Sequence, residues 1–167
     1  MIDLVLGTNY EADLYIETTI VSYLSARPSR DLIVAAHQQI TREWWEHAST
    51  RFDLFISAVV IDEISRGDET AVSRRMETVA GMDVLASTGG VDELAVFYAR
   101  DLPIPDKAVA DCYHLAFACW HGIDYLVSWN MAHIVNGDVI GRVIDLNFSR
   151  GIRTPVICTP EELMEES

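Results

Sequence analysis

Short apolar runs alternate along this chain with longer segments of mixed polarity. The runs that are short enough to be buried strands are residues 14–16, 54–56, 84–85, 125–128 and 156–158. In the longer segments, apolar residues recur every three or four positions, which is the spacing of one face of an α-helix. Strands that alternate with helices predict a mostly parallel sheet with helices on both faces. We therefore expect a three-layer α/β fold.

The expected helices follow from this spacing and from end signals. They cover residues 30–49, 57–67, 68–79, 91–100, 106–121 and 139–148. Ser57 and Asp68 are residue types that cap helix N-termini, and Gly67 and Gly122 can end helices. Thr159-Pro160-Glu161-Glu162 fits a capping box with proline at the first helical position, which predicts one further helix start.

Length and composition fit a single globular domain over residues 1–167. Half of the residues are hydrophobic, and neither a repeat nor a linker divides the chain. Residues 1–13 contain no Lys or Arg, and no apolar run approaches the about 18 residues that span a bilayer, so we expect neither a signal peptide nor a membrane span. Cys112, Cys119 and Cys158 lack close paired spacing, which predicts buried thiols in a reducing cytoplasm.

The net charge of −14 argues against broad electrostatic binding of nucleic acid. Part of this charge belongs to a short acidic tail from about residue 160, with Glu161, Glu162, Glu165 and Glu166. The basic residues are eleven Arg and one Lys, and Arg is the better bidentate phosphate ligand. An acidic nuclease is therefore still compatible with the sequence. Arg27, Arg30 and Arg42 are its best candidates for phosphate contacts, although solvated surface charge is the commoner role of a single Arg.

Four oxygen-bearing side chains follow or interrupt apolar segments: Glu17, Glu63, Asp111 and Asn130. Ligands of open α/β sheets gather outside the carboxyl ends of the strands. Glu17 directly follows the first strand, Asn130 lies just past strand 125–128, and Asp111 interrupts an apolar helical stripe. Each of them alone is most simply a helix cap or a surface charge. Together they predict a site for a hard divalent cation, Mg²⁺ or Mn²⁺, at this edge of the sheet.

The sequence around these residues resembles a known family. The motifs are Tyr-Ile-Glu-Thr-Thr at 15–19, Val-Val-Ile-Asp-Glu-Ile-Ser-Arg-Gly-Asp at 59–68, Ala-Asp-Cys-Tyr-His-Leu-Ala-Phe-Ala at 110–118 and Leu-Val-Ser-Trp-Asn-Met-Ala-His-Ile at 126–134. In this order they resemble the PIN-domain ribonucleases, most closely the VapC-type toxins of bacterial toxin–antitoxin pairs. The resemblance extends from about Asp13 to Glu162.

The resemblance implies a PIN-like fold and a cytoplasmic, Mg²⁺- or Mn²⁺-dependent endoribonuclease. The family's first Asp corresponds to Glu17 and its last acid to Asn130, and both are departures from the family pattern. Glu17 and Asp111 would be the main metal ligands, and Glu63 a ligand or a base that orients water. Asn130 would orient a water or a ligand, and the hydroxyl of Thr19 would assist the site.

Two histidines have two interpretations each. His114 lies three residues after Asp111, so it is either a hydrogen-bond partner of that carboxylate or, more commonly for a histidine in an apolar helix, a satisfied core residue. His133 lies three residues after Asn130 and either contacts the substrate or stabilises its loop.

The remaining expectations concern binding partners and alternative functions. RNA and an antitoxin are the expected partners, and an apolar face around Ile33, Ile40 and Trp44 favours a homodimer. The first alternative is a non-catalytic PIN-like module that binds protein or RNA, which the departures at Glu17 and Asn130 favour. A phosphatase or receiver domain ranks third, because it needs an Asp nucleophile where this chain has Glu17.

Overall fold

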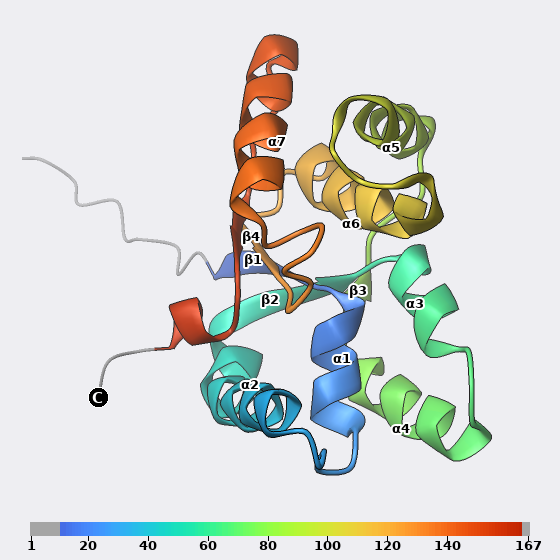
Figure 1. Ribbon diagram of the computed structural model, residues 1–167, viewed down its shortest axis with the longest axis vertical. Helices are drawn as coiled ribbons and strands as arrows, with labels where there is room; N and C mark the ends of the chain where they lie inside the picture. Colours follow the sequence, from blue (N-terminus) through green and yellow to red (C-terminus); the bar gives the residue numbers. More distant parts are fainter. Residues whose placement is uncertain (1–10, 165–167) are drawn as a thin grey trace, which may run out of the picture.

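The computed structural model describes residues 11–164, and its centre is a parallel sheet of five strands (Figure 1). The strands are β1 (Ala12–Ile16), β2 (Phe52–Ile56), β3 (Asp83–Val84), β4 (Tyr125–Val127) and β5 (Val156–Cys158). Their order is β3-β2-β1-β4-β5, and every neighbouring pair is parallel. Leu14 of β1 is paired with Leu54 on one side and with Tyr125 on the other. The expected parallel α/β sheet is thereby confirmed.

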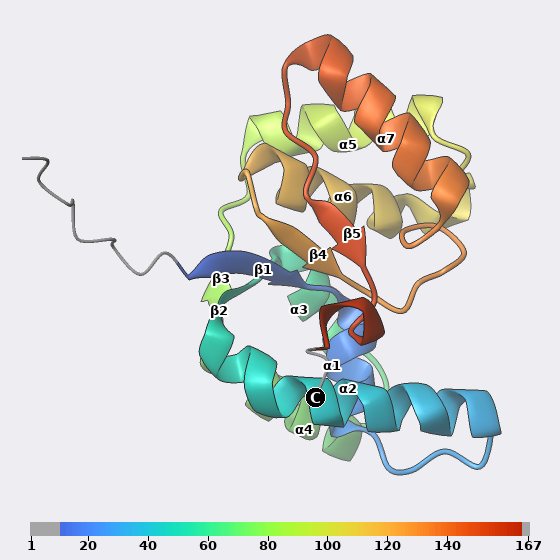
Figure 2. The ribbon, with the colours of Figure 1, turned by 90° about the vertical axis from the view of Figure 1, so that its left-hand side faces the viewer.

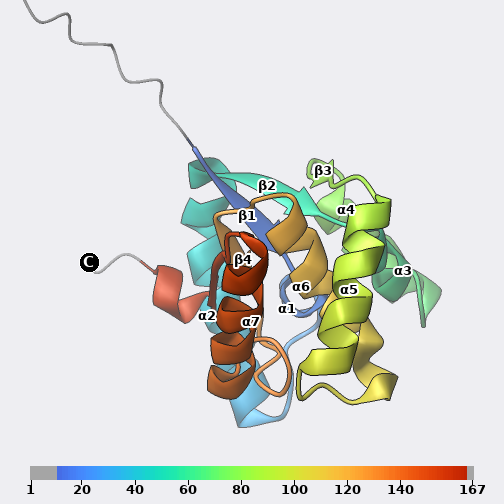
Figure 3. The same ribbon diagram turned by 90° about the horizontal axis from the view of Figure 1, so that it is seen from above.

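Helices cover both faces of this sheet. They are α1 (Thr18–Ser25), α2 (Leu32–Arg51), α3 (Ala58–Ile64), α4 (Glu69–Val79), α5 (Gly89–Asp101), α6 (Val109–Trp120) and α7 (Gly137–Arg150). Helices α5, α6 and α7 lie on one side of the sheet, and α1, α2 and α4 lie on the other (Figure 2). Seen from above, α5 and α6 lie side by side (Figure 3). None of the helices in residues 11–164 is long and apolar enough to cross a membrane.

Helix α1 is absent from the sequence-based expectations. Its first four residues are β-branched, and such residues lose side-chain freedom in a helix, so local propensity argues against it. Two features of the fold stabilise the helix instead. Ile20 and Val21 are completely buried in the core, and the side chain of Glu17 accepts a hydrogen bond from the Thr19 amide at the N-terminus. Burial outweighed propensity here.

The helix-end signals in the sequence predict some helix ends correctly and others wrongly. Asp68 caps α4 as expected, by accepting a hydrogen bond from the Ala71 amide. Ser57 lies at the N-cap of α3 without capping it, and α3 ends at Ile64 rather than at Gly67. The segment after β5 forms a 3₁₀ turn, Glu161–Leu163, in which Glu162 accepts hydrogen bonds from the amide and hydroxyl of Thr159. The carboxylate half of the predicted capping box is therefore present.

The core contains all three cysteines. They are free and buried, as predicted, and burial raises the pKa of Cys112 to about 11 and that of Cys158 to about 12. Trp44 is buried as well, so on α2 only Leu32 and Ile33 remain as large exposed hydrophobic residues. The broad apolar face expected around Trp44 is therefore much narrower. Glu165 and Glu166 of the acidic tail, and most of the segment 1–13, lie outside the described residues.

Candidate active site

The site lies where the direction of the strand order changes. From β1 the chain proceeds to β2 and β3 on one side, and it returns to β4 and β5 on the other. At such a point the connections that follow the two neighbouring strands run in opposite directions. Ligands of open α/β sheets bind there, outside the carboxyl ends of the strands. Glu17 follows β1 directly, and the segment from Ser128 to Asn130 follows β4. The Glu17 amide donates to the Val127 carbonyl (3.2 Å), which ties the two strand ends together.

Glu17 is a buried carboxylate with three hydrogen-bond donors on one of its oxygens. Only 3% of the residue is exposed. Its Oε2 accepts hydrogen bonds from the Thr19 amide (3.1 Å), the Thr19 hydroxyl (2.5 Å) and the Ser128 hydroxyl (2.7 Å). These donors offset the lost hydration of the charge, and the first of them caps α1. The Thr19 hydroxyl also accepts from the Trp129 amide (2.8 Å), so Thr19 positions Glu17 against the loop after β4.

The second acid, Glu63, is held by His114. Its Oε2 lies 2.9 Å from Nε2 of His114, and it also accepts a hydrogen bond from the Thr18 hydroxyl. The other ring nitrogen of His114, Nδ1, lies 2.8 Å from the hydroxyl of Tyr15, which in turn bonds the Ser57 hydroxyl at 2.7 Å. Both nitrogens of the ring are thus engaged. His114 is therefore a satisfied buried histidine, which was the commoner of its two interpretations, and its carboxylate partner is Glu63 rather than Asp111.

The pKa values of this pair shift in opposite directions. Burial by itself would lower the pKa of His114, but the hydrogen bond to Glu63 and the charges of Glu17, Glu63 and Asp111 raise it above its usual value. Burial would likewise raise the pKa of Glu63, but the hydrogen bond and charge of His114, with smaller contributions from Thr18 and Arg66, lower it. Both shifts favour an imidazolium that donates to an ionised carboxylate.

Asp111 forms a second group with Asn130 and His133. Its Oδ1 accepts from the Asn130 side-chain amide (3.0 Å), and its Oδ2 lies 2.7 Å from Nδ1 of His133. The His133 amide donates back to Oδ1 of Asn130 (3.0 Å), so this histidine does stabilise its loop. The hydroxyl of Ser128 joins the two groups, because it accepts from the Asn130 amide (2.8 Å) while it donates to Glu17. The four predicted residues thus lie at one edge of the sheet, in two linked groups.

The donor set suits a divalent cation. Glu17, Glu63 and His114 each offer a ligand atom, and these three atoms lie within 4.8 Å of one another. Asp111, expected to be a main ligand beside Glu17, is not among the three. Within residues 11–164, no Lys or Arg forms a salt bridge with any of the site carboxylates. Carboxylate oxygens favour Mg²⁺ or Mn²⁺, so Glu17 and Glu63 suit such an ion. His114 would ligate a metal only after it lost the proton that it shares with Glu63, because a metal binds the neutral imidazole.

Several residues of the site were not anticipated from the sequence. They are Tyr15, Thr18, Ser57 and Ser128, and each contributes a hydroxyl that bonds a site residue or its partner. Thr18, Ser57 and Ser128 each lie within two residues after a strand end, and Tyr15 lies within β1. Their position relative to the strands is the sequence signal that could have identified them. Arg27 and Arg30 lie in the exposed loop between α1 and α2, and Arg42 donates to the Ala26 carbonyl there (3.1 Å).

Comparisons with known proteins show a similarity of structure rather than of sequence. No family model matches the sequence, and no curated protein matches it. Among solved structures, a chain in the crystal structure of VapBC2 from Rickettsia felis, bound to a DNA fragment from their promoter, is similar to this protein with a TM-score of 0.54. The two chains are 15% identical, and the match covers 87% of this chain and 97% of the other. At this identity the similarity shows a shared fold.

The buried hydroxyl of Tyr15 gives a testable consequence. Tyr15→Phe leaves His114 Nδ1 and the Ser57 hydroxyl without this partner, and a buried polar group that loses its partner costs about 1–3 kcal/mol. We expect the free energy of unfolding, measured with urea, to fall by about that amount. Tyr125→Phe is the matched control on β4, because the Tyr125 hydroxyl bonds none of the described residues. Equal effects of the two substitutions would contradict the role assigned to Tyr15.

Proposed function

We propose that this protein is a metal-dependent endoribonuclease of the PIN-like fold that acts as the toxin of a toxin–antitoxin pair. The observation that carries the proposal is the cluster of Glu17, Glu63 and His114 near the carboxyl end of β1. Asp111 is linked to this cluster through Asn130 and Ser128. The fold shared with a chain of VapBC2 supports it, and so does the ordered set of motifs around these residues.

In the proposed mechanism, Mg²⁺ or Mn²⁺, when bound, would supply an activated water and charge neutralisation at the scissile phosphate. Glu17 and Asp111, with Glu63, would hold the cation. Glu63 is kept ionised by His114, so it can also accept a hydrogen from the attacking water and orient it. Asn130 holds the Asp111 carboxylate in place through its amide group, and His133 holds it from the other side.

A proposed antitoxin partner follows from the same comparison. The similar chain belongs to the complex VapBC2, which was crystallised with promoter DNA. We propose that the present protein likewise pairs with an antitoxin in the cytoplasm, that RNA is its substrate, and that it forms a homodimer. Leu32 and Ile33, which are 85% and 69% exposed, are apolar residues that such contacts would cover.

One observation favours the non-catalytic alternative. Both oxygens of Asp111 already have hydrogen-bond partners in the protein, and Asn130 adds no charge to the site. A PIN-like module that binds protein or RNA without cleaving it would tolerate such an arrangement. A nuclease must exchange at least one of these bonds for a metal ligand.

Two assays separate the two functions. The purified protein is incubated with single-stranded RNA in Mn²⁺ or Mg²⁺ and, in parallel, in EDTA; the nuclease cleaves only with metal, and a module cleaves in neither. Co-expression with the small protein encoded by the adjacent gene then tests the toxin assignment. A stable complex that suppresses cleavage is the expected result. Metal-dependent cleavage without any such complex would support the nuclease assignment and contradict the toxin assignment.

A further inference from the structure

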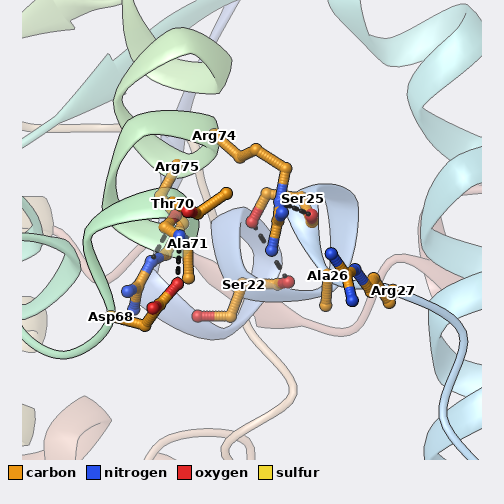
Figure 4. Close-up of a pocket in the computed structure, with 9 residues that line it drawn as sticks. All are labelled: Ser22, Ser25, Ala26, Arg27, Asp68, Thr70, Ala71, Arg74 and Arg75. Carbon is orange, nitrogen blue, oxygen red and sulfur yellow. Dashed lines mark hydrogen bonds between the residues drawn. The ribbon is translucent and has the colours of Figure 1, made fainter.

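A pocket rich in arginine lies at the other end of α1 from Glu17. It is a cavity of about 570 Å³ between the C-terminal end of α1, the residues that follow it and the first turns of α4 (Figure 4). Its lining includes Ser22 and Ser25 from α1, Arg27 from the loop, and Arg74 and Arg75 from α4. Three arginines therefore line one cavity of a protein whose net charge is −14.

These arginines are not neutralised by carboxylates. Within residues 11–164, none of the three forms a salt bridge, whereas Arg66, Arg100 and Arg153 each pair with an Asp elsewhere. Arg74 donates through Nε to the Ser25 carbonyl (3.1 Å), and Arg75 donates to the carbonyls of Ala71 (3.1 Å) and Arg66 (2.9 Å). The side chain of Arg27 bonds none of the described residues. Backbone contacts thus fix two guanidinium groups and leave several of their N–H donors available.

The single acid in the lining, Asp68, offsets at most one of these three positive charges. Asp68 is the N-cap of α4, and its Oδ1 accepts a hydrogen bond from the Ala71 amide (3.0 Å). Positive charges around one cavity repel one another, and an anion in the cavity relieves this repulsion. Their planar donor sets match the oxygens of a phosphate, which they can bind in bidentate fashion. The pocket is therefore chemically suited to a phosphate group.

A polar face of α1 connects the pocket to the candidate active site. Thr18, Ser22 and Ser25 follow one another at spacings of four and three residues, so their hydroxyls lie on the same face of the helix. Thr18 donates to Glu63, and Ser22 and Ser25 line the pocket. Along the eight residues of α1 the two ends are roughly 12 Å apart, at 1.5 Å per residue. A single RNA strand that followed this face would place one phosphate at the pocket and another at the carboxylates, a few nucleotides apart.

We propose that Arg27, Arg74 and Arg75 bind a backbone phosphate of single-stranded RNA, a few nucleotides from the phosphate at Glu17 and Glu63. The assignment rests on the proposed ribonuclease function and adds to it a direction along α1 for the substrate strand. It also explains how a strongly acidic protein holds RNA, because the contact depends on a local group of arginines rather than on net charge.

The first test measures RNA binding without cleavage. Arg27→Gln/Arg75→Gln is introduced into an Asp111→Asn background and titrated with a fluorescein-labelled single-stranded RNA of 16 nucleotides at several salt concentrations. Loss of a charge-assisted phosphate contact should weaken binding about tenfold and reduce the slope of log K against log salt by about 0.7. Arg100→Gln/Arg142→Gln removes the same charge on the other side of the sheet and should change neither quantity. Arg27→Gln alone serves if the double variant does not fold.

The second test uses substrate length in the otherwise unchanged protein. The pocket variant should raise KM for the 16-nucleotide RNA and leave kcat unchanged, while cleavage of a dinucleotide, which cannot reach the pocket, should be the same as in the wild type. Arg27→Lys, which keeps the positive charge, should retain part of the RNA binding that Arg27→Gln loses. If the wild type binds RNA without cleaving it and the pocket variant still weakens binding, the phosphate site stands and the ribonuclease function fails.

Three results would overturn the phosphate site. In the first, the wild type does not bind the RNA at all. In the second, the pocket and control variants weaken binding equally, which would indicate a general effect of charge. In the third, the pocket variant keeps full RNA binding but no longer binds the protein encoded by the adjacent gene. That result would identify the pocket as a protein-docking surface.

Discussion

Mn²⁺ should stabilise the wild-type protein, and Asp111→Asn should remove both this stabilisation and RNA cleavage. A ligand that binds only the native state stabilises it by about 2.7 kcal/mol when its free concentration is a hundredfold above Kd. For a protein of this size that corresponds to a rise in Tm of roughly 5–11 °C. Loss of a charged ligand, or of the carboxylate that aligns one, should reduce cleavage on the order of 100-fold or more. Differential scanning calorimetry and a gel assay of RNA cleavage measure the two effects.

The geometry around Asp111 predicts that this variant still folds. Asn keeps an oxygen that can accept from the Asn130 amide, and its NH₂ group takes the place of the oxygen that faces Nδ1 of His133. We therefore expect its metal-free stability to differ from that of the wild type by less than about 1 kcal/mol, which is within the range of ordinary single substitutions. Asp145→Asn, at an exposed position on α7, is the control that should retain activity and metal stabilisation. An unfolded Asp111→Asn protein would instead make Asp111 a structural residue.

Two substitutions of Glu17 should separate its structural role from its chemical role. Glu17→Ala removes the cap of α1 and leaves the hydroxyls of Thr19 and Ser128 without their acceptor. Lost caps cost about 1 kcal/mol, and buried groups without a partner cost about 1–3 kcal/mol, so we expect a loss of about 3 kcal/mol in the free energy of unfolding. Glu17→Gln keeps a carbonyl oxygen for these donors and removes only the charge. It should remain folded and lose metal binding and cleavage.

Chemical denaturation of the metal-free proteins gives the first comparison, and cleavage assays with Mn²⁺ give the second. Equal instability of Glu17→Ala and Glu17→Gln would mean that the buried charge itself, rather than its acceptor oxygens, stabilises the end of β1. Full activity of Glu17→Gln would remove Glu17 from the set of metal ligands and weaken the nuclease proposal at its most buried residue.

Local pattern predicted the layers of the fold well. Alternating strands and helices were expected from hydrophobic spacing alone, and the parallel sheet has these strands. The pattern failed at α1, because the β-branched residues at the start of this helix have low helical propensity and the helix is stabilised by burial of Ile20 and Val21. It also failed at Ser57, a good capping residue by type. Its hydroxyl bonds Tyr15 on the neighbouring strand instead of the helix end.

The sequence by itself determined which residues are candidates for the site. Carboxylates that follow or interrupt apolar segments are conspicuous in one dimension, so Glu17, Glu63 and Asp111 were identifiable before the fold was known. The tertiary structure decided how they are grouped. Its strand order places the ends of β1 and β4 side by side, and it allocates His114 to Glu63 rather than to Asp111. Such choices depend on contacts between residues that are 51 to 111 positions apart in the chain, and no local spacing encodes those distances.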